Sequence, residues 1–226
     1  MKRSDFIKTL AAGAVLSSPY LVSAQSTTYT LALIGSGWWG TNILREALKH
    51  GGCKLVALCD VDANQSQKCL EEVKRISSFS PKIYTDYEEL LQKEKPDIVI
   101  NATPDHWHAL IAIAALKHGA HLYLEKPIGH TVNEGKAIVV GFHRRYSPHN
   151  ISGMDFLKSG KVGSIKEVRA FVNYNFWPGK PSPEIATPAG LDWDRWCGPA
   201  PVVPYRSSIH PKGWRQRLEY ANGQLG

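Results

Sequence analysis

Three glycines, Gly35, Gly37 and Gly40, stand in GxGxxG spacing directly after a short apolar run. This spacing is typical of a turn that binds the pyrophosphate of a dinucleotide. We expect Gly35 to form the tight turn, Gly37 to let the backbone approach the pyrophosphate, and Gly40 to let the following helix pack against the sheet. The first turn of that helix favours an anion, because it presents unpaired N–H groups and the positive end of the dipole. Trp38 and Trp39 stand between the glycines and are expected to line the cofactor site.

Asp60 ends the next apolar run, about twenty residues after the glycine turn. A carboxylate at this point accepts hydrogen bonds from the two hydroxyls of a ribose. Asp62 follows closely and no arginine stands nearby in the sequence, so a 2′-phosphate would be repelled. The sequence therefore predicts NAD as the cofactor in preference to NADP.

Lys126 follows a later apolar run and is preceded by Glu125. At the carboxyl end of a parallel strand, a lysine beside the cofactor can donate to a substrate oxygen, stabilise alkoxide charge or take part in proton transfer. Glu125 could hold the lysine by ion pairing. Without further context, a solvated loop charge is the simpler interpretation of this lysine.

His106 and His108 have a spacing that could ligate a metal, but no third ligand follows at a fitting distance in the sequence. Capping of a helix start is the simpler interpretation of the pair. The four cysteines show neither CxxC pairing nor histidine partners at zinc spacing. We therefore predict no metal site. Cys59 is expected to be a small buried hydrophobe, although a disulfide stays open.

Strand and helix patterns alternate along the first half of the chain. The expected strands are residues 30–34, 54–59, 82–84, 97–101 and 121–124, and the expected helices are residues 41–50, 64–76, 88–93 and 106–118. In the last helix Leu110, Ile111, Ala114 and Ala115 are spaced to form an apolar face, and Gly119 ends it. Such alternation predicts an α/β fold, a doubly wound parallel sheet of Rossmann type over residues 29–140.

The pattern changes after residue 140. Residues 149–159 predict a helix, residues 164–176 alternate like a strand, and residues 177–204 are rich in proline and tryptophan. A chain of 226 residues suits one complete domain and part of another. We expect residues 141–226 to form an incomplete α+β substrate domain that closes over the cofactor at the domain junction.

The first 24 residues resemble a signal peptide. Three basic residues precede a mostly apolar stretch that ends in the small residues Val22, Ser23 and Ala24. We expect export, to the periplasm, by the Sec route or by a degenerate twin-arginine route in which Ser4 replaces the second arginine. Cleavage would remove three basic residues and one acidic residue and lower the net charge from +7 to +5. This surplus suits an anionic cofactor and requires no nucleic acid, and no later run is apolar enough to span a membrane.

Several motifs in order resemble the Gfo/Idh/MocA family of sugar and polyol oxidoreductases. Besides the glycine turn they are ATPDHWH at 102–108, EKP at 125–127, RRYSPH at 144–149 and LDWDRWCGPA at 191–200. The resemblance covers residues 29–226. It implies a Rossmann domain, NAD and hydride transfer. The exported form resembles the secreted branch of the family, which includes NAD-dependent glycosidases.

The resemblance also implies roles for individual residues. Thr103, Pro104 and His108 resemble the loop that lines the path from adenine to nicotinamide. Glu125 and Lys126 resemble the EKP pair, whose lysine reaches the nicotinamide and a substrate hydroxyl.

Four further residues suit a substrate cleft, because guanidinium groups and indole faces fit hydroxyl-rich rings. Surface charge and aromatic packing explain them equally well. They are Arg145, His210, Trp214 and Arg215.

The chain departs from the family pattern in two places. It ends at Gly226, before the family's GDxGxHxxD motif, so we expect a C-terminal truncation that removes the main general base and the later strands of the second domain. Only nine residues, 128–136, precede the next apolar run, fewer than a crossover with its helix needs. We infer an internal deletion of about one helix. An uncovered sheet face predicts association into a homo-oligomer, through Val168, Ala170, Val172 and Tyr174.

Three functions follow from these observations. The first is an NAD-dependent oxidoreductase that acts on a sugar or polyol, with Lys126 polarising the hydroxyl. The second is an NAD-dependent glycosidase, in which NAD transiently oxidises a ring carbon so that elimination and readdition cleave the bond. The third is a non-catalytic chain that binds NAD without turnover.

Overall fold

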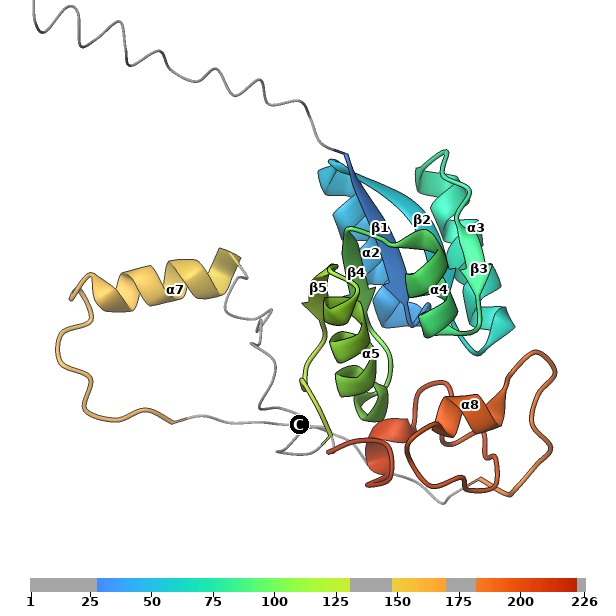
Figure 1. Ribbon diagram of the computed structural model, residues 1–226. Helices are drawn as coiled ribbons and strands as arrows, with labels where there is room; N and C mark the ends of the chain where they lie inside the picture. Colours follow the sequence, from blue (N-terminus) through green and yellow to red (C-terminus); the bar gives the residue numbers. More distant parts are fainter. Residues whose placement is uncertain (1–27, 131–147, 170–181, 223–226) are drawn as a thin grey trace, which may run out of the picture.

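The computed structural model describes residues 28–130, 148–169 and 182–222 (Figure 1). Strands and helices alternate in the expected order: β1 (Tyr29–Ile34), α2 (Trp38–His50), β2 (Cys53–Cys59), α3 (Ala63–Ile76), β3 (Lys82–Tyr84), α4 (Tyr87–Glu94), β4 (Ile98–Asn101), α5 (Asp105–Lys117) and β5 (His121–Leu124). The strands pair in parallel in the order β3-β2-β1-β4-β5. The predicted α/β fold is confirmed, and the chain reverses its winding direction between β1 and β4.

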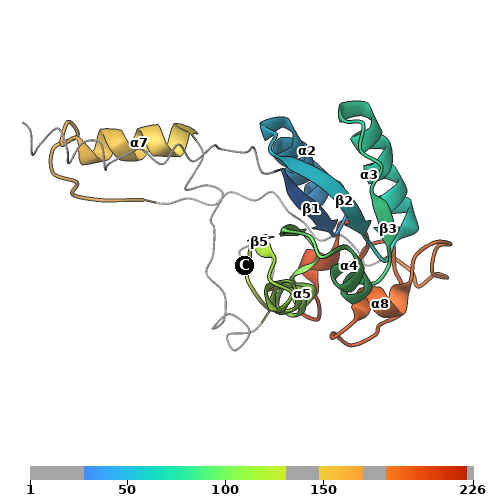
Figure 2. The same cartoon turned by 45° about the horizontal axis from the view of Figure 1, so that its top comes forward.

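Helices cover both faces of this sheet (Figure 2). Successive side chains of β1 point to opposite faces. Leu31 and Leu33 lie in the core on the side of α2 and α3, whereas Ala32 and Ile34 lie in the core on the side of α4 and α5. The apolar strands therefore hold the carboxyl ends of β1, β2, β4 and β5 in a fixed row.

Two details of the helices differ from the sequence prediction. α2 begins at Trp38 rather than at residue 41, because Gly37 is its N-cap and the helix starts directly at the glycine turn. Leu110 is 44% exposed, so its predicted place on an apolar face is wrong. The buried apolar residues of α5 are Ala109, Ile111, Ala112 and Ala115. α5 ends as predicted before Gly119, whose φ is +81°.

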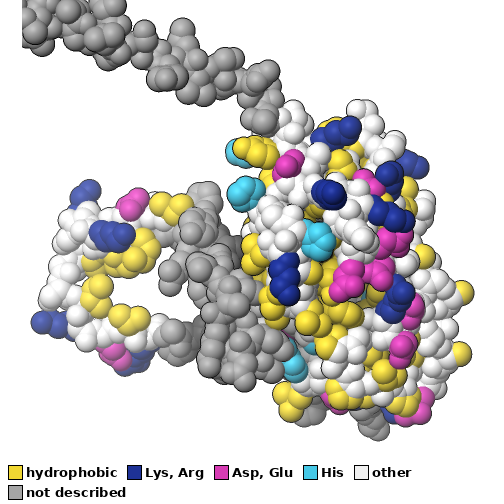
Figure 3. Space-filling model, in the orientation of Figure 1, with side chains coloured by type: hydrophobic (Ala, Val, Ile, Leu, Met, Phe, Trp, Pro, Cys, Tyr) yellow, Lys and Arg dark blue, Asp and Glu magenta, His cyan; other side chains and the backbone are white. Residues whose placement is uncertain are grey.

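α7 (Pro148–Lys158) confirms the helix predicted after residue 140. Every residue from 151 to 169 is exposed, and Figure 3 shows hydrophobic side chains along this helix. Residues 164–169 form no strand, because none of the described strands lies beside them to share a hydrogen-bond ladder. Val168 is exposed as expected.

Several predictions lie outside the described residues. They concern the signal peptide at 1–24, residues 131–136 of the inferred deletion, the domain boundary at 140, Arg145, and the sheet positions Ala170, Val172 and Tyr174. Within the described ranges, no helix has the length and apolar character needed to cross a membrane. All four cysteines are free thiols, and Cys59 is buried as predicted.

Residues 182–222, the C-terminal segment, contain α8 (Trp193–Cys197) and the short helix η2 (Trp214–Gln216). Aromatic side chains from Trp193 to Tyr220 form a buried cluster in it. The segment attaches to the chain just after β2, where Ala63 N–H donates to the carbonyl of Gly190 at 2.8 Å and Asp192 N–H donates to that of Val61 at 3.0 Å. The segment therefore lies against the carboxyl edge of the sheet.

Candidate functional site

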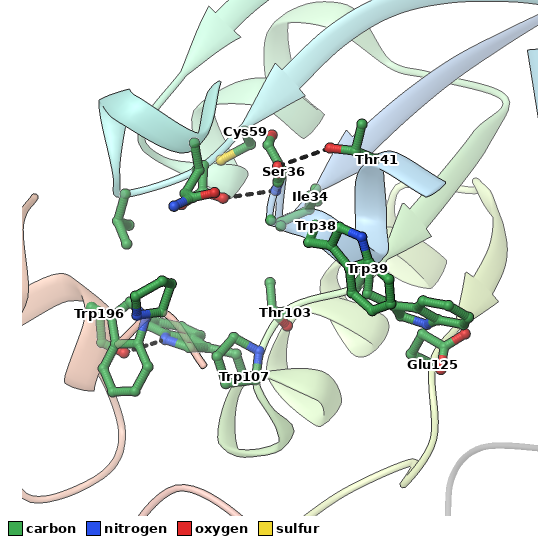
Figure 4. Close-up of a pocket in the computed structure, with 18 of the residues that line it drawn as sticks. Ile34, Ser36, Trp38, Trp39, Thr41, Cys59, Thr103, Trp107, Glu125 and Trp196 are labelled. Carbon is green, nitrogen blue, oxygen red and sulfur yellow. Dashed lines mark hydrogen bonds between the residues drawn. The ribbon is translucent and has the colours of Figure 1, made fainter. Parts of the chain in front are cut away.

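A cavity of about 1350 Å³ lies between the carboxyl edge of the sheet and the C-terminal segment (Figure 4). Residues at or directly after the ends of all five described strands contribute to its wall, because their loops meet at this edge. Most of the predicted cofactor residues line it together: Gly35, Gly37, Trp38, Trp39, Asp60, Thr103, Pro104, His108, Glu125 and Lys126. Doubly wound sheets bind their ligands at this position, beside the reversal between β1 and β4.

The three glycines of the turn are required for three different reasons. Gly35 has φ +90°, and an added Cβ would lie 2.7 Å from the backbone of Ala102. An added Cβ on Gly40 would lie 2.0 Å from the carbonyl oxygen of Gly35, so this glycine serves the packing of α2 and does not line the cavity. An added Cβ on Gly37 would meet no described atom within 4 Å. Only Gly37 therefore leaves its space open for a ligand.

Ser36 adds an unsatisfied group to this turn. Its hydroxyl oxygen is buried and has no hydrogen-bond partner among the described residues, although the residue lines the cavity. A buried hydroxyl without a partner is uncommon in a folded protein. An oxygen-rich anion at the N-terminus of α2 would accept from the backbone N–H groups there, and rotation of the Ser36 side chain toward it would satisfy the hydroxyl as well.

Asp60 is fixed beside the turn by two backbone donors. Its carboxylate accepts from the N–H of Ser36 at 2.7 Å and from the N–H of Asp62 at 3.0 Å. Burial raises the pKa of Asp60 to about 6, and these N–H groups hold the pKa below the value that burial alone would give. The group is thus an oriented acceptor, charged at neutral pH.

Arg45 and Lys68 also line the cavity, which the sequence interpretation missed. Arg45 donates to the carboxylate of Glu72 at 2.7 and 3.0 Å and to Asn42 at 2.9 Å. No arginine stands near Asp60 in the sequence, but Arg45 lines the same cavity as Asp60. Arg45 could have been found from its helical spacing, since it follows Thr41 by four residues and Thr41 also lines the cavity.

Glu125 and Lys126 stand at the other end of the row, directly after β5. Glu125 is buried and accepts a hydrogen bond from the hydroxyl of Tyr123 at 3.1 Å. Lys126 is half-buried and lines the cavity. In strand order β2-β1-β4-β5, Asp60 and Lys126 are separated by three strand spacings, about 14 Å. The cavity therefore offers an acceptor at one end and an ammonium group at the other.

Further charged groups surround Lys126. Burial raises the pKa of Asp105, although the charges of His108, Arg215 and Lys126 act to lower this pKa. Burial lowers the pKa of Arg215, although the negative charges of Asp105 and Glu125 act to raise this pKa. The Arg215 guanidinium lies 4.0 Å from the ring centroid of Trp214, a cation–π contact. Opposite charges thus compensate one another in a poorly solvated part of the cavity.

The two histidines of α5 do not cap the helix, so that interpretation is wrong. His108 contacts the carbonyl of Thr103 at 2.8 Å through Nε2 and that of Pro127 through Nδ1. This residue connects the start of α5 to the loops after β4 and β5. It positions both loops that border the cavity.

His106 connects α5 to the C-terminal segment. Its ring nitrogens contact the carbonyls of Trp196 at 3.0 Å and Tyr220 at 3.2 Å, and burial lowers its pKa. The described residues contain no group of three or more metal-ligating side chains. The carbonyl contacts, made across long sequence separations, could not have been found from local pattern.

His210, Trp214 and Arg215, three of the four candidate substrate residues, line the same cavity as Lys126. His210 Nε2 lies 2.9 Å from the carboxylate of Asp62, and both side chains are buried. Burial raises the pKa of Asp62, but the hydrogen bonds from His210 and Asn64 outweigh it, and the pKa is lowered overall. The contact fixes the C-terminal segment beside β2.

We expect acid to weaken this attachment. A carboxyl group with a lowered pKa stabilises the fold above its ordinary pKa of about 4, and this stabilisation is lost as the pH falls through the lowered value. In Asp62→Asn the amide oxygen still caps α3, whereas the charge and the second oxygen that faces His210 are removed. Thermal melts should show a stability advantage of the wild type that is fully present at about pH 7 and shrinks as the pH falls below about 4. Asp194→Asn, at an exposed position, is the control. A wild-type advantage that stays constant with pH would contradict this expectation.

Comparisons with known proteins agree with this geometry. Residues 29–145 match the GFO_IDH_MocA model, an oxidoreductase family with an NAD-binding Rossmann fold. An inositol 2-dehydrogenase of Salmonella paratyphi B is 28% identical over 177 residues, which cover 73% of this chain and 50% of that protein. A glycosyl hydrolase family 109 protein of Stenotrophomonas maltophilia is 27% identical over 254 aligned positions, covering 100% of this chain and 52% of that protein.

A solved structure shares the fold as well. The myo-inositol 2-dehydrogenase of Lactobacillus plantarum superposes with a TM-score of 0.52 and 28% identity, over 61% of this chain and 43% of that one. The chain spans about half the length of the curated relatives described above.

Proposed function

The chain belongs to the Gfo/Idh/MocA family of oxidoreductases, and from this premise we propose that the protein oxidises or reduces a sugar or cyclic polyol with NAD. One observation carries the proposal: a glycine turn open to an anion, an acidic ribose acceptor and a lysine line one cavity in strand order. The inositol dehydrogenases among the relatives support a small hydroxylated ring as the substrate.

The residues present fit the cofactor. The pyrophosphate would take the N–H groups at the start of α2 and the hydroxyl of Ser36, in the space that Gly37 leaves open. The adenosine ribose would donate to Asp60, and the nicotinamide would extend toward Lys126. When bound, the nicotinamide supplies the hydride chemistry.

The chain's own part in the reaction is to hold and polarise the substrate. Lys126, which lines the cavity, would donate to the reacting oxygen and stabilise its negative charge. Glu125 and Asp105, both buried, balance the positive charge of Lys126 and Arg215. His210 and Trp214 would border the ring of the substrate.

NAD, rather than NADP, is the cofactor that this proposal favours. The charge of Arg45 is engaged by Glu72, so Asp60 dominates the ribose end. We expect Asp60→Asn to reduce the preference for NAD over NADP by about tenfold or more. Because Asp60 protonates near pH 6, the NAD affinity of the wild type should fall below that pH, and the variant should lose this dependence. Calorimetric titration with both dinucleotides tests this, and an unchanged preference would mean that another residue reads the ribose.

A glycosidase that uses NAD without net redox change is the second candidate. The family 109 glycosyl hydrolase supports it, because its match covers the whole of this chain. The two candidates differ in product. A dehydrogenase accumulates NADH, whereas a glycosidase releases a sugar while its NAD stays oxidised over the full cycle.

The first experiment is calorimetric titration of the purified chain with NAD, followed by incubation with a panel of inositols, hexoses and aryl glycosides. Binding with NADH formation would support the oxidoreductase, and glycoside cleavage without NADH would support the second candidate. NAD binding without turnover of any compound would favour the non-catalytic alternative. Absence of NAD binding would overturn the proposal.

A further inference from the structure

Two tryptophans of this chain are exposed where others are buried. Trp38 is 71% exposed and Trp39 is 37% exposed, whereas Trp193, Trp196 and Trp214 are 8%, 4% and 6% exposed. An indole left in water forgoes the free energy that its burial would contribute. Adjacent exposed aromatic side chains on the wall of a cavity therefore indicate a surface that a ligand covers.

Both indoles lie in the first turn of α2 and line the cavity. Their ring centroids are 5.5 Å apart and their planes are inclined by 41°. Figure 4 shows them on the side of the cavity where Glu125 lies, away from Trp196. The pair thus borders the end of the cavity that holds Lys126.

The sequence predicts Trp38 and Trp39 as cofactor residues, but the pyrophosphate requires only their backbone. A pyrophosphate at this turn would use backbone N–H groups, and the two positions between the second and third glycines accept any residue type. Gly37 and Ser36 already provide the open space and the hydroxyl that suit the phosphates. The pyrophosphate therefore leaves the indole faces to a ring that reaches the Lys126 end of the cavity.

The surroundings of the pair define the chemistry of that part. Indole faces accept a flat or C–H-rich surface, and the charged groups of Glu125 and Lys126 beside them accept and donate hydrogen bonds at its edge. A neutral pyranose or cyclitol ring has both features, because its axial C–H groups present an apolar face and its hydroxyls form the rim.

We propose that Trp38 and Trp39 form the ring-stacking subsite for the substrate, a neutral carbohydrate or cyclitol ring held face-on with its reacting hydroxyl toward Lys126. This subsite rests on the proposed function, since Lys126 gives the ring its orientation. It adds a determinant of substrate affinity that is separate from cofactor binding.

The test compares Trp38→Ala and Trp38→Phe in the full chain, saturated with NADH. Saturation-transfer NMR titrations with myo-inositol, N-acetyl-D-galactosamine and D-glucose measure ring binding, and calorimetry measures NADH binding. The alanine variant should bind the best of these probes about tenfold more weakly, and the phenylalanine variant should stay within about threefold of the wild type. NADH affinity should change by less than about threefold in both. Tyr29→Ala, an exposed aromatic residue at the amino end of β1, is the matched control.

Three results would overturn the subsite while leaving the proposed function intact. In the first, the wild type binds NADH but none of the three probes. In the second, Trp38→Ala binds the probe as tightly as the wild type, and in the third it loses as much affinity for NADH as for the probe. A wild-type chain that binds no NADH would overturn both proposals. Thermal melts confirm that each variant is folded, which the exposure of Trp38 makes the expected result.

Discussion

Gly37→Val is expected to weaken NAD binding by at least about a hundredfold while leaving the fold intact. The backbone of Gly37 has φ −61° and ψ 178°, which valine adopts without strain. The new side chain would meet no described atom near its Cβ, so it would extend into the space proposed for the pyrophosphate. Calorimetry with NAD and a thermal melt measure the two effects separately.

Gly40→Ala is the matched control, because it changes another glycine of the same turn. Its Cβ would lie 2.0 Å from the carbonyl oxygen of Gly35, and backbone must move to accept it. We expect a loss of about 1–3 kcal/mol in the free energy of unfolding. If Gly37→Val lowered stability as Gly40→Ala does, or bound NAD like the wild type, the assignment of the open space at Gly37 would be wrong.

Lys126→Met is expected to lower kcat/KM by about a thousandfold, a loss of about 4 kcal/mol of transition-state stabilisation. Methionine keeps an unbranched side chain of similar size but donates no hydrogen bond to the reacting oxygen. Because the backbone of the turn and Asp60 would hold the other half of the cofactor, NAD affinity should change by less than about tenfold. Steady-state kinetics with the substrate found in the panel, together with NAD calorimetry, measure both quantities.

Lys117→Met, at an exposed position at the end of α5, controls for the loss of one positive charge. It should leave kcat/KM within about twofold of the wild type. A Lys126→Met enzyme that retained most of its turnover would show that another group polarises the substrate.

The local elements of the sheet could be predicted from the sequence because their signals are local. The bounds of β3 and β5 agree with the predicted strands, and Gly119 ends α5 as expected. Apolar period, glycine at positive φ and the GxGxxG spacing depend on neighbours a few residues away. The same signals selected the candidate cofactor residues, most of which line one cavity at the carboxyl edge of the sheet.

The predictions that failed depended on partners that the local pattern does not contain. Residues 164–169 alternate like a strand, but a strand forms only beside another, and the described sheet offers them none. Leu110 has helical apolar spacing, yet the buried side of α5 is formed by its neighbours Ala109 and Ile111. Periodicity states which residues can share a face, and packing decides which face is covered.

The sequence by itself determined the family, the glycine turn, the acidic residue after β2 and the lysine after β5. Only the tertiary structure decided what surrounds them. The contact between Asp62 and His210 joins residues 148 positions apart, and Arg45 meets Glu72 across two helices. Such contacts arise because parallel strands bring their carboxyl ends to one edge, where loops and a distant segment meet. The spacing of residues in the sequence does not predict these contacts, because they depend on how distant segments pack in the folded chain.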